Sequence, residues 1–182
     1  MGNLSKVTAP DGGIITYNYN VFGRVESETD VLDGKITYTY DKNTLQEKDE
    51  LGNVTTYTYD KLDRVITQTD AAKNTITYEY DALGRTVKEI DEQGGETKYT
   101  YDKLGNVEGT TDAKGNITTY EYDKNGNLSK KTDALGAVIS YTYDKANQLI
   151  EEVDALGSKA TYTYDARGNV LVKTDAKGNK TS

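Results

Sequence analysis

Residues 99–122 read YTYDKLGNVEGTTDAKGNITTYEY, and this stretch holds the features that decide the fold. A Tyr-x-Tyr pair stands at each end, and the pattern Asp-x-x-Gly occurs twice between them, at Asp102–Gly105 and Asp112–Gly115. Aspartate at the start of a turn accepts hydrogen bonds from nearby backbone N–H groups. Glycine in the fourth place tolerates the left-handed backbone that closes a hairpin through a bulge. The stretch therefore predicts strand, tight turn, strand, tight turn.

The segments between the turns have the pattern of strands. In residues 36–40, Ile36 and two tyrosines alternate with two threonines, so that the two sets lie on opposite faces. Thr and Tyr both favour β-structure, and no segment has a helical period. We therefore expect an all-β chain.

The pattern recurs along the whole chain. Successive Tyr-x-Tyr pairs are separated by 21, 19, 21, 21, 21, 21 and 21 residues. This predicts a single array over residues 1–182, made of eight repeats of about 21 residues with partial repeats at both ends. The pairs contain every tyrosine of the chain: Tyr17, Tyr19, Tyr38, Tyr40, Tyr57, Tyr59, Tyr78, Tyr80, Tyr99, Tyr101, Tyr120, Tyr122, Tyr141, Tyr143, Tyr162 and Tyr164.

Each repeat is predicted to contain two turns of the Asp-x-x-Gly kind. Lys73 stands where most turns have glycine, and we expect that turn to move its left-handed residue to Asn74. The 19-residue repeat lacks two residues between Asp41 and Asp49, a change that keeps the alternation of the two faces. The predicted turn residues are Asp81, Gly84, Asp102, Gly105, Asp112, Gly115, Asp123, Gly126, Asp133, Gly136, Asp154, Gly157, Asp165 and Gly168.

The composition excludes several classes of function. The net charge of −8 argues against a nucleic-acid partner, because phosphate binding needs clustered Lys and Arg. The chain has no histidine and no cysteine, which removes the commonest general base, thiolate chemistry and zinc-thiolate sites. No apolar run approaches membrane-spanning length, and the residues after Met1 lack the apolar stretch that we would expect of a signal peptide. We expect no enzyme activity, no cofactor and no metal, since no constellation of residues interrupts the repetition.

Two motifs have a functional reading beside the structural one. The tyrosines are expected to pack one face of the sheet, and the alternative is a platform on which sugars stack. The aspartates are expected to form turns, and the alternative is calcium binding, although each turn offers only one carboxylate. Arg24, Arg64 and Arg85 follow the first turn of their repeats and are expected to pair with a neighbouring aspartate.

The motif in residues 78–85 (YEYDALGR) and 120–127 (YEYDKNGN) resembles the YD repeat of RHS proteins, bacterial wall-associated proteins and teneurins. The resemblance covers the chain from Gly2 to Gly178. It implies that the hairpins join into a long antiparallel strip that spirals into a hollow shell. In RHS toxins the shell encloses a variable C-terminal toxin, and in teneurins it serves cell contact. A secreted or cell-surface location in a bacterium is implied by the same resemblance.

We therefore predict tandem antiparallel β-hairpins forming a curved strip, with a two-sided β-solenoid of 21 residues per coil as the alternative. Sixteen strands at ~4.8 Å spacing give a strip ~77 Å long. Closed once, it is too narrow for a domain with a radius of gyration of ~13 Å. The expected function is therefore a non-enzymatic segment of a longer shell that encloses or presents a C-terminal toxin or effector. The alternative is an extracellular binding or adhesion module that recognises carbohydrate or a cell-surface protein. Expected partners are neighbouring repeats of a longer parent chain, and open strand edges also allow self-association.

Overall fold

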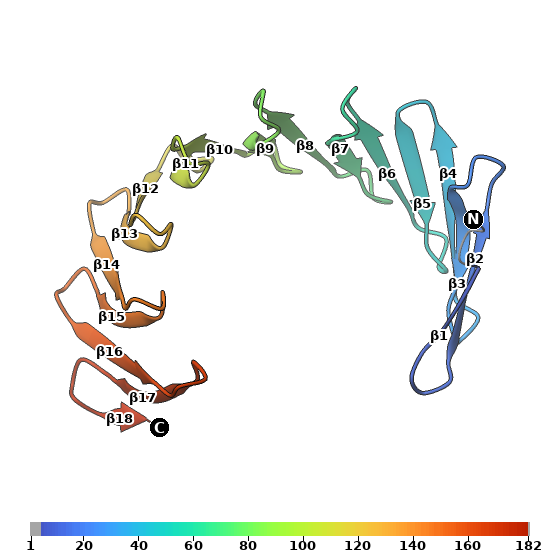
Figure 1. The fold of residues 1–182 in the computed structure, drawn as a ribbon. Coiled ribbons are helices and arrows are strands. Elements are labelled where there is room, and N and C mark those ends of the chain that lie inside the picture. Colours follow the sequence, from blue (N-terminus) through green and yellow to red (C-terminus); the bar gives the residue numbers. More distant parts are fainter. Residues whose placement is uncertain (1–4, 182) are drawn as a thin grey trace. The chain divides into compact units, whose positions relative to one another are not determined.

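The computed structural model describes residues 5–181 of the chain. The chain divides into two compact units, Met1–Gly94 and Gly95–Ser182, and each consists of strands joined by short turns. Taken by itself, each unit is an open strip that bends along its length (Figure 1). No helix among the described residues is long and apolar enough to span a membrane.

The strands of both units follow one plan, in which a longer strand with the Tyr-x-Tyr pair precedes a shorter one. The first unit contains β1 (Lys6–Thr8), β2 (Ile14–Tyr19), β3 (Val25–Thr29), β4 (Lys35–Asp41), β5 (Thr44–Lys48), β6 (Val54–Tyr59), β7 (Val65–Thr69), β8 (Thr75–Tyr80) and β9 (Thr86–Ile90). The second unit contains β10 (Glu96–Tyr101), β11 (Val107–Thr111), β12 (Ile117–Tyr122), β13 (Leu128–Thr132), β14 (Val138–Tyr143), β15 (Leu149–Val153), β16 (Lys159–Tyr164), β17 (Val170–Thr174) and β18 (Lys180–Thr181).

Consecutive strands within each unit pair antiparallel, so the strands lie in chain order. In β4, for example, Ile36 lies opposite Glu28 of the preceding strand, and Tyr38 lies opposite Glu47 of the following strand. The predicted all-β fold of tandem antiparallel hairpins is therefore confirmed. The β-solenoid is wrong, because its coils would place parallel neighbours beside each strand.

One hairpin differs from the others at its turn. In the other hairpins that open with a Tyr-x-Tyr strand, the register shifts just before the second tyrosine, as between Glu121 and Tyr122. The β4–β5 hairpin has no shift and closes through the two residues Lys42 and Asn43. The missing residues therefore remove the bulge and shorten the turn. As expected from an even deletion, Tyr57 keeps its place in the alternation and pairs with Leu45 and Gln68.

The left-handed residue of the turn at Asp70 is Lys73 itself, with φ 73°. The expectation that Asn74 would take this role is wrong. Asn74 instead donates its backbone N–H and its carboxamide to Asp70, at 2.9 and 2.8 Å. The hydrogen bonds of Asn74 hold the standard turn geometry, and the geometry imposes a positive φ on whichever residue stands fourth.

The strips have no hydrophobic core. No hydrophobic side chain among the described residues is fully buried, and Ser27 is the only buried polar one, at 5% exposure. All sixteen tyrosines are half-buried. A sheet one layer thick covers neither of its faces, so within each unit the tyrosines pack sideways on neighbouring strands and keep one side open. Stability must therefore come from cross-strand neighbours and backbone hydrogen bonds.

Candidate functional site

The second tyrosine of a pair fastens one hairpin to the preceding one. The Tyr122 hydroxyl donates to the Val107 carbonyl at 2.9 Å. This bond joins the end of β12 to the start of β11, at the edge of the strip where no turn connects these two strands. The acceptor lies fifteen residues earlier in every such case. The other examples are Tyr40 to Val25 (2.9 Å), Tyr80 to Val65 (2.6 Å), Tyr143 to Leu128 (3.0 Å) and Tyr164 to Leu149 (2.7 Å). This periodic bond uses the polar end of a ring whose body packs on the sheet.

The first tyrosine of a pair lies opposite the middle of the next strand, where the partner is often charged. Tyr38 lies opposite Glu47, and Tyr78 lies opposite Glu89. Burial raises the pKa of both tyrosines, and the neighbouring glutamates add to the rise. In the second unit the same place holds Lys131 opposite Tyr120 and Glu152 opposite Tyr141, so the charge of this row changes along the chain.

Many of the turn aspartates use both carboxylate oxygens within their own turn, whereas Asp133 and Asp154 accept backbone N–H groups through Oδ1. In the turn at Asp102, Oδ1 accepts the backbone N–H groups of Leu104 and Asn106 at 2.8 and 2.9 Å. Oδ2 accepts the Asn106 carboxamide at 2.9 Å. The carboxamide is the largest cause that holds the pKa of Asp102 below its usual value, and the backbone donors add to it.

The predicted glycines close these turns through their backbone. Each donates its N–H to the carbonyl of the aspartate three residues earlier, at 2.9–3.1 Å, and each has a positive φ. The pairs are Gly84 to Asp81, Gly105 to Asp102, Gly115 to Asp112, Gly126 to Asp123, Gly136 to Asp133, Gly157 to Asp154 and Gly168 to Asp165. Within residues 5–181 the acidic side chains form no group of three or more that could hold a metal ion.

Two of the three arginines after the first turn pair with an aspartate, as expected. Arg64 lies 2.6 Å from Asp60, and Arg85 lies 2.7 Å from Asp81. Arg64 also donates to the Asp81 carbonyl at 3.2 Å and stacks over the Tyr80 ring at 4.6 Å. Arg24 has Asn20 in place of the aspartate, and its guanidinium lies over the Tyr40 ring at 4.3 Å. Arg24 and Arg64 thus each link the start of one strand to the next hairpin.

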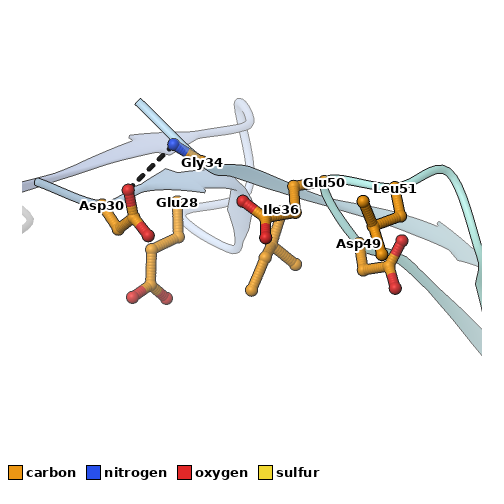
Figure 2. Close-up of a pocket in the computed structure, with 7 residues that line it drawn as sticks. All are labelled: Glu28, Asp30, Gly34, Ile36, Asp49, Glu50 and Leu51. Atoms are coloured by element: carbon orange, nitrogen blue, oxygen red, sulfur yellow. Dashed lines mark hydrogen bonds between the residues drawn. The ribbon is translucent and has the colours of Figure 1, made fainter. Parts of the chain in front are cut away.

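A shallow groove of about 230 Å³ lies in the first unit beside the turns that begin at Asp30 and Asp49, at the edge opposite the arginine-bearing turns. Figure 2 shows Glu28, Ile36 and Asp49 extending from the same side of the strip, with Asp30 accepting the Gly34 N–H at 2.8 Å. The repeat-equivalent groove of the second unit has about 320 Å³ and is lined by Lys131, Asp133, Ala137, Ile139, Asp154, Ala155 and Leu156. The groove is therefore a product of the repeat, and its strongly acidic lining belongs to the first unit.

Sequence reasoning missed two of these features. The first is the bond from the second tyrosine to the carbonyl fifteen residues earlier, which becomes visible only when strands are paired. The second is the role of the residue after the turn glycine, whose side chain donates a hydrogen bond to Oδ2 of the turn aspartate. The recurrence of Asn or Arg in that place, as at Asn106, Asn116 and Arg85, was a signal that could have identified it.

The chain matches the family described as RHS Repeat over nearly its whole length. The matched segments are residues 2–35, 42–75, 59–96, 80–117, 101–138, 122–159 and 143–180. None of the curated proteins compared with the chain matches it.

Solved structures with a similar fold belong to large toxin assemblies. One is the crystal structure of TcdB2-TccC3, with a TM-score of 0.61 and 14% identity over 96% of this chain. Another is a Tc holotoxin pore of Photorhabdus luminescens, with a TM-score of 0.62 and 14% identity over 94% of this chain. The chain covers 12% of the length of either structure, and identity this low supports similarity of fold alone.

Proposed function

The chain belongs to the RHS repeat family, and we propose that it works as a wall segment of a larger RHS shell that encloses or presents a C-terminal toxin or effector. The observation that carries the proposal is that each unit is a single-layer strip without a core, in which adjacent hairpins pair strand to strand. Such a strip extends by adding repeats at either end, because each hairpin contacts only the adjacent ones. Its role is that of a scaffold, and its partners are further repeats of the parent chain.

The periodic bonds support a mechanical role. In the second unit Tyr122, Tyr143 and Tyr164 each tie a hairpin to the previous one at the edge that no turn closes. A wall needs such ties, because otherwise neighbouring hairpins would separate on the side opposite their connecting turn. In this proposal the protein is exported from a bacterium and acts outside the cell, as the toxin assemblies of similar fold suggest.

The experiment that tests the shell begins with the reading frame of the source gene on both sides of this segment. We expect further RHS repeats followed by an unrelated C-terminal domain. Limited proteolysis of that parent protein should then leave the C-terminal domain intact until the repeats are unfolded by denaturant. A C-terminal domain that is digested while the repeats remain folded would contradict encapsulation.

The second candidate function is an adhesive or binding module that recognises carbohydrate or a cell-surface protein. The half-exposed tyrosines favour it, because a face fully occupied by packing would offer no ring to a ligand. A glycan array probed with the labelled protein tests this candidate. Binding that is lost when Tyr38 and Tyr78 are changed to Ala would support it, and an array without signal would contradict carbohydrate recognition.

A further inference from the structure

The β4–β5 hairpin creates a feature that the regular repeats lack. Its turn, Lys42 and Asn43, is shorter than the neighbouring turns at the same edge, which span residues 20–23 and 60–63. The shortening leaves a notch of about 180 Å³ in the first unit. Its lining includes Arg24, Tyr40, Lys42, Leu45, Tyr59 and Asp63. We call this hollow the notch.

Arg24 brings an uncommitted guanidinium to the notch. Arg64 and Arg85 occupy the same repeat position and are neutralised by Asp60 and Asp81. At Arg24 the matching residue is Asn20, whose side-chain oxygen accepts the Arg24 backbone N–H at 3.0 Å and offers no charge. Among the described residues, no carboxylate lies within ion-pair distance of Arg24. Its guanidinium instead lies over the rings of Tyr40, at 4.3 Å, and Phe22, at 5.9 Å.

Tyr59 brings an uncommitted hydroxyl. As the second tyrosine of its pair, it would donate to the carbonyl fifteen residues earlier, which is Thr44 in the shortened hairpin. Within residues 5–181 the Tyr59 hydroxyl makes no hydrogen bond. Asn43 instead holds the Tyr59 backbone, accepting its N–H at 2.8 Å and donating its carboxamide to its carbonyl at 3.0 Å. The short turn thus fixes the position of Tyr59 and leaves its ring and hydroxyl free.

The chemistry of the lining defines a ligand class. Arg24 and Lys42 supply two cations against the single carboxylate of Asp63, which gives the notch one net positive charge in a chain of net charge −8. Arginine binds carboxylates through two parallel N–H donors and stacks on flat groups. Leu45 and the Tyr59 ring provide an apolar wall. The volume is below the usual 300–1,000 Å³ of ligand pockets, so the occupant must be small.

We propose that the notch binds a small carboxylate attached to a flat ring. The carboxylate pairs with Arg24 and Lys42, the ring lies against Tyr59 and Leu45, and the Tyr59 hydroxyl donates to a ligand oxygen. The regular repeats differ from this site, because their turns are two residues longer and the two other arginines at this position, Arg64 and Arg85, are paired with aspartates.

The test uses three probes and an NMR titration of the ¹⁵N-labelled chain. Benzoate carries both the ring and the charge, acetate carries the charge alone, and benzyl alcohol carries the ring alone. We expect benzoate to shift the amide signals of Arg24, Lys42 and Tyr59. Acetate and benzyl alcohol should each bind at least about tenfold more weakly than benzoate. Benzoate that leaves these amides unmoved, or acetate that binds as tightly as benzoate, overturns the proposal.

Matched variants separate the notch from general charge effects. Arg24→Gln should weaken benzoate about tenfold or more, while Arg85→Gln, the same change at a paired arginine, should leave it unchanged. Inserting Ala-Gly between Lys42 and Asn43 restores the 21-residue spacing and should abolish binding. Equal effects of the two glutamine variants, or binding that survives the insertion, overturn the proposal. The result is independent of the shell function, because only residues of the first unit take part.

Discussion

The two tyrosine hydroxyls of one pair differ in their hydrogen bonds. Tyr122 donates to Val107, whereas the Tyr120 hydroxyl forms no hydrogen bond among the described residues. Tyr122→Phe should therefore lower the free energy of unfolding by about 1 kcal/mol. Urea denaturation followed by circular dichroism measures this, with Tyr120→Phe as the matched control. Equal losses in the two variants would show that the hydroxyl bond contributes nothing specific.

The turn carboxylates predict the acid side of the stability profile. Asp112 accepts the Asn116 carboxamide at 2.7 Å, and this bond is the largest cause that lowers the pKa of Asp112. A folded-state pKa below the unfolded value of about 3.9 means that the carboxylate stabilises the fold above that pH. This stability is lost as the pH falls through the folded-state pKa. The pKa of Asp175, in another turn of the second unit, is lowered in the same way by the carboxamide of Asn179.

The variant Asn116→Ala removes the main donor to Asp112. We expect the pKa of Asp112 to rise toward its ordinary value, as measured by the pH dependence of its side-chain carbon NMR signal. Asp175 keeps its own donor and should titrate as in the parent chain. A pKa of Asp112 that stays low in the variant would assign the shift to the backbone donors instead.

Lys73 stores strain in its turn, because it has a φ of 73° where most turns have glycine. A left-handed backbone costs an ordinary residue roughly 1–2 kcal/mol. Lys73→Gly should therefore raise the free energy of unfolding by up to about 1 kcal/mol, measured as a higher midpoint of urea denaturation. Lys114, in the third place of a similar turn, has no positive φ, and Lys114→Gly should give no gain. A loss of stability at both positions would contradict the strain.

At the scale of elements, the β10–β11 hairpin shows how a glycine leaves room for the side chain opposite it. Gly109 of β11 lies opposite Thr100 of β10, and a Cβ at Gly109 would lie 2.7 Å from the Thr100 hydroxyl oxygen. Alanine normally stabilises a strand position relative to glycine by roughly 0.5–1 kcal/mol. We expect Gly109→Ala to gain little alone and more when combined with Thr100→Ala. A double-mutant cycle in urea measures the coupling, and strictly additive effects would exclude the contact.

The same scale explains which elements could be predicted. The Tyr-x-Tyr strands and the Asp-x-x-Gly turns were identifiable because each depends on residues that are close in sequence. The β4–β5 hairpin was expected to keep its alternation, and it does. Its notch could not be foreseen, because it arises where two turns forty residues apart flank a third that is shorter.

At the scale of the molecule, the strips lack a core, and their stability must be a sum of repeat and neighbour contributions. The first and last strands, β1 and β18, each pair with one neighbour within their unit, β2 and β17. Amide hydrogen exchange should therefore be fastest in β1 and β18 and slowest near the middle of each unit. Uniform protection along the chain would show global, two-state unfolding in place of stepwise fraying.

The sequence alone determined the repeat, the alternation of faces, the two turns per repeat and the family, because each of these depends on local residue types or on their period. The tertiary structure decided what the side chains do between repeats. It set the tyrosine bonds fifteen residues apart, placed Lys73 in a left-handed backbone, left the tyrosines half-buried and opened the notch beside Arg24. These depend on which hairpins lie side by side and how far their turns project, and strand pairing in space settles both.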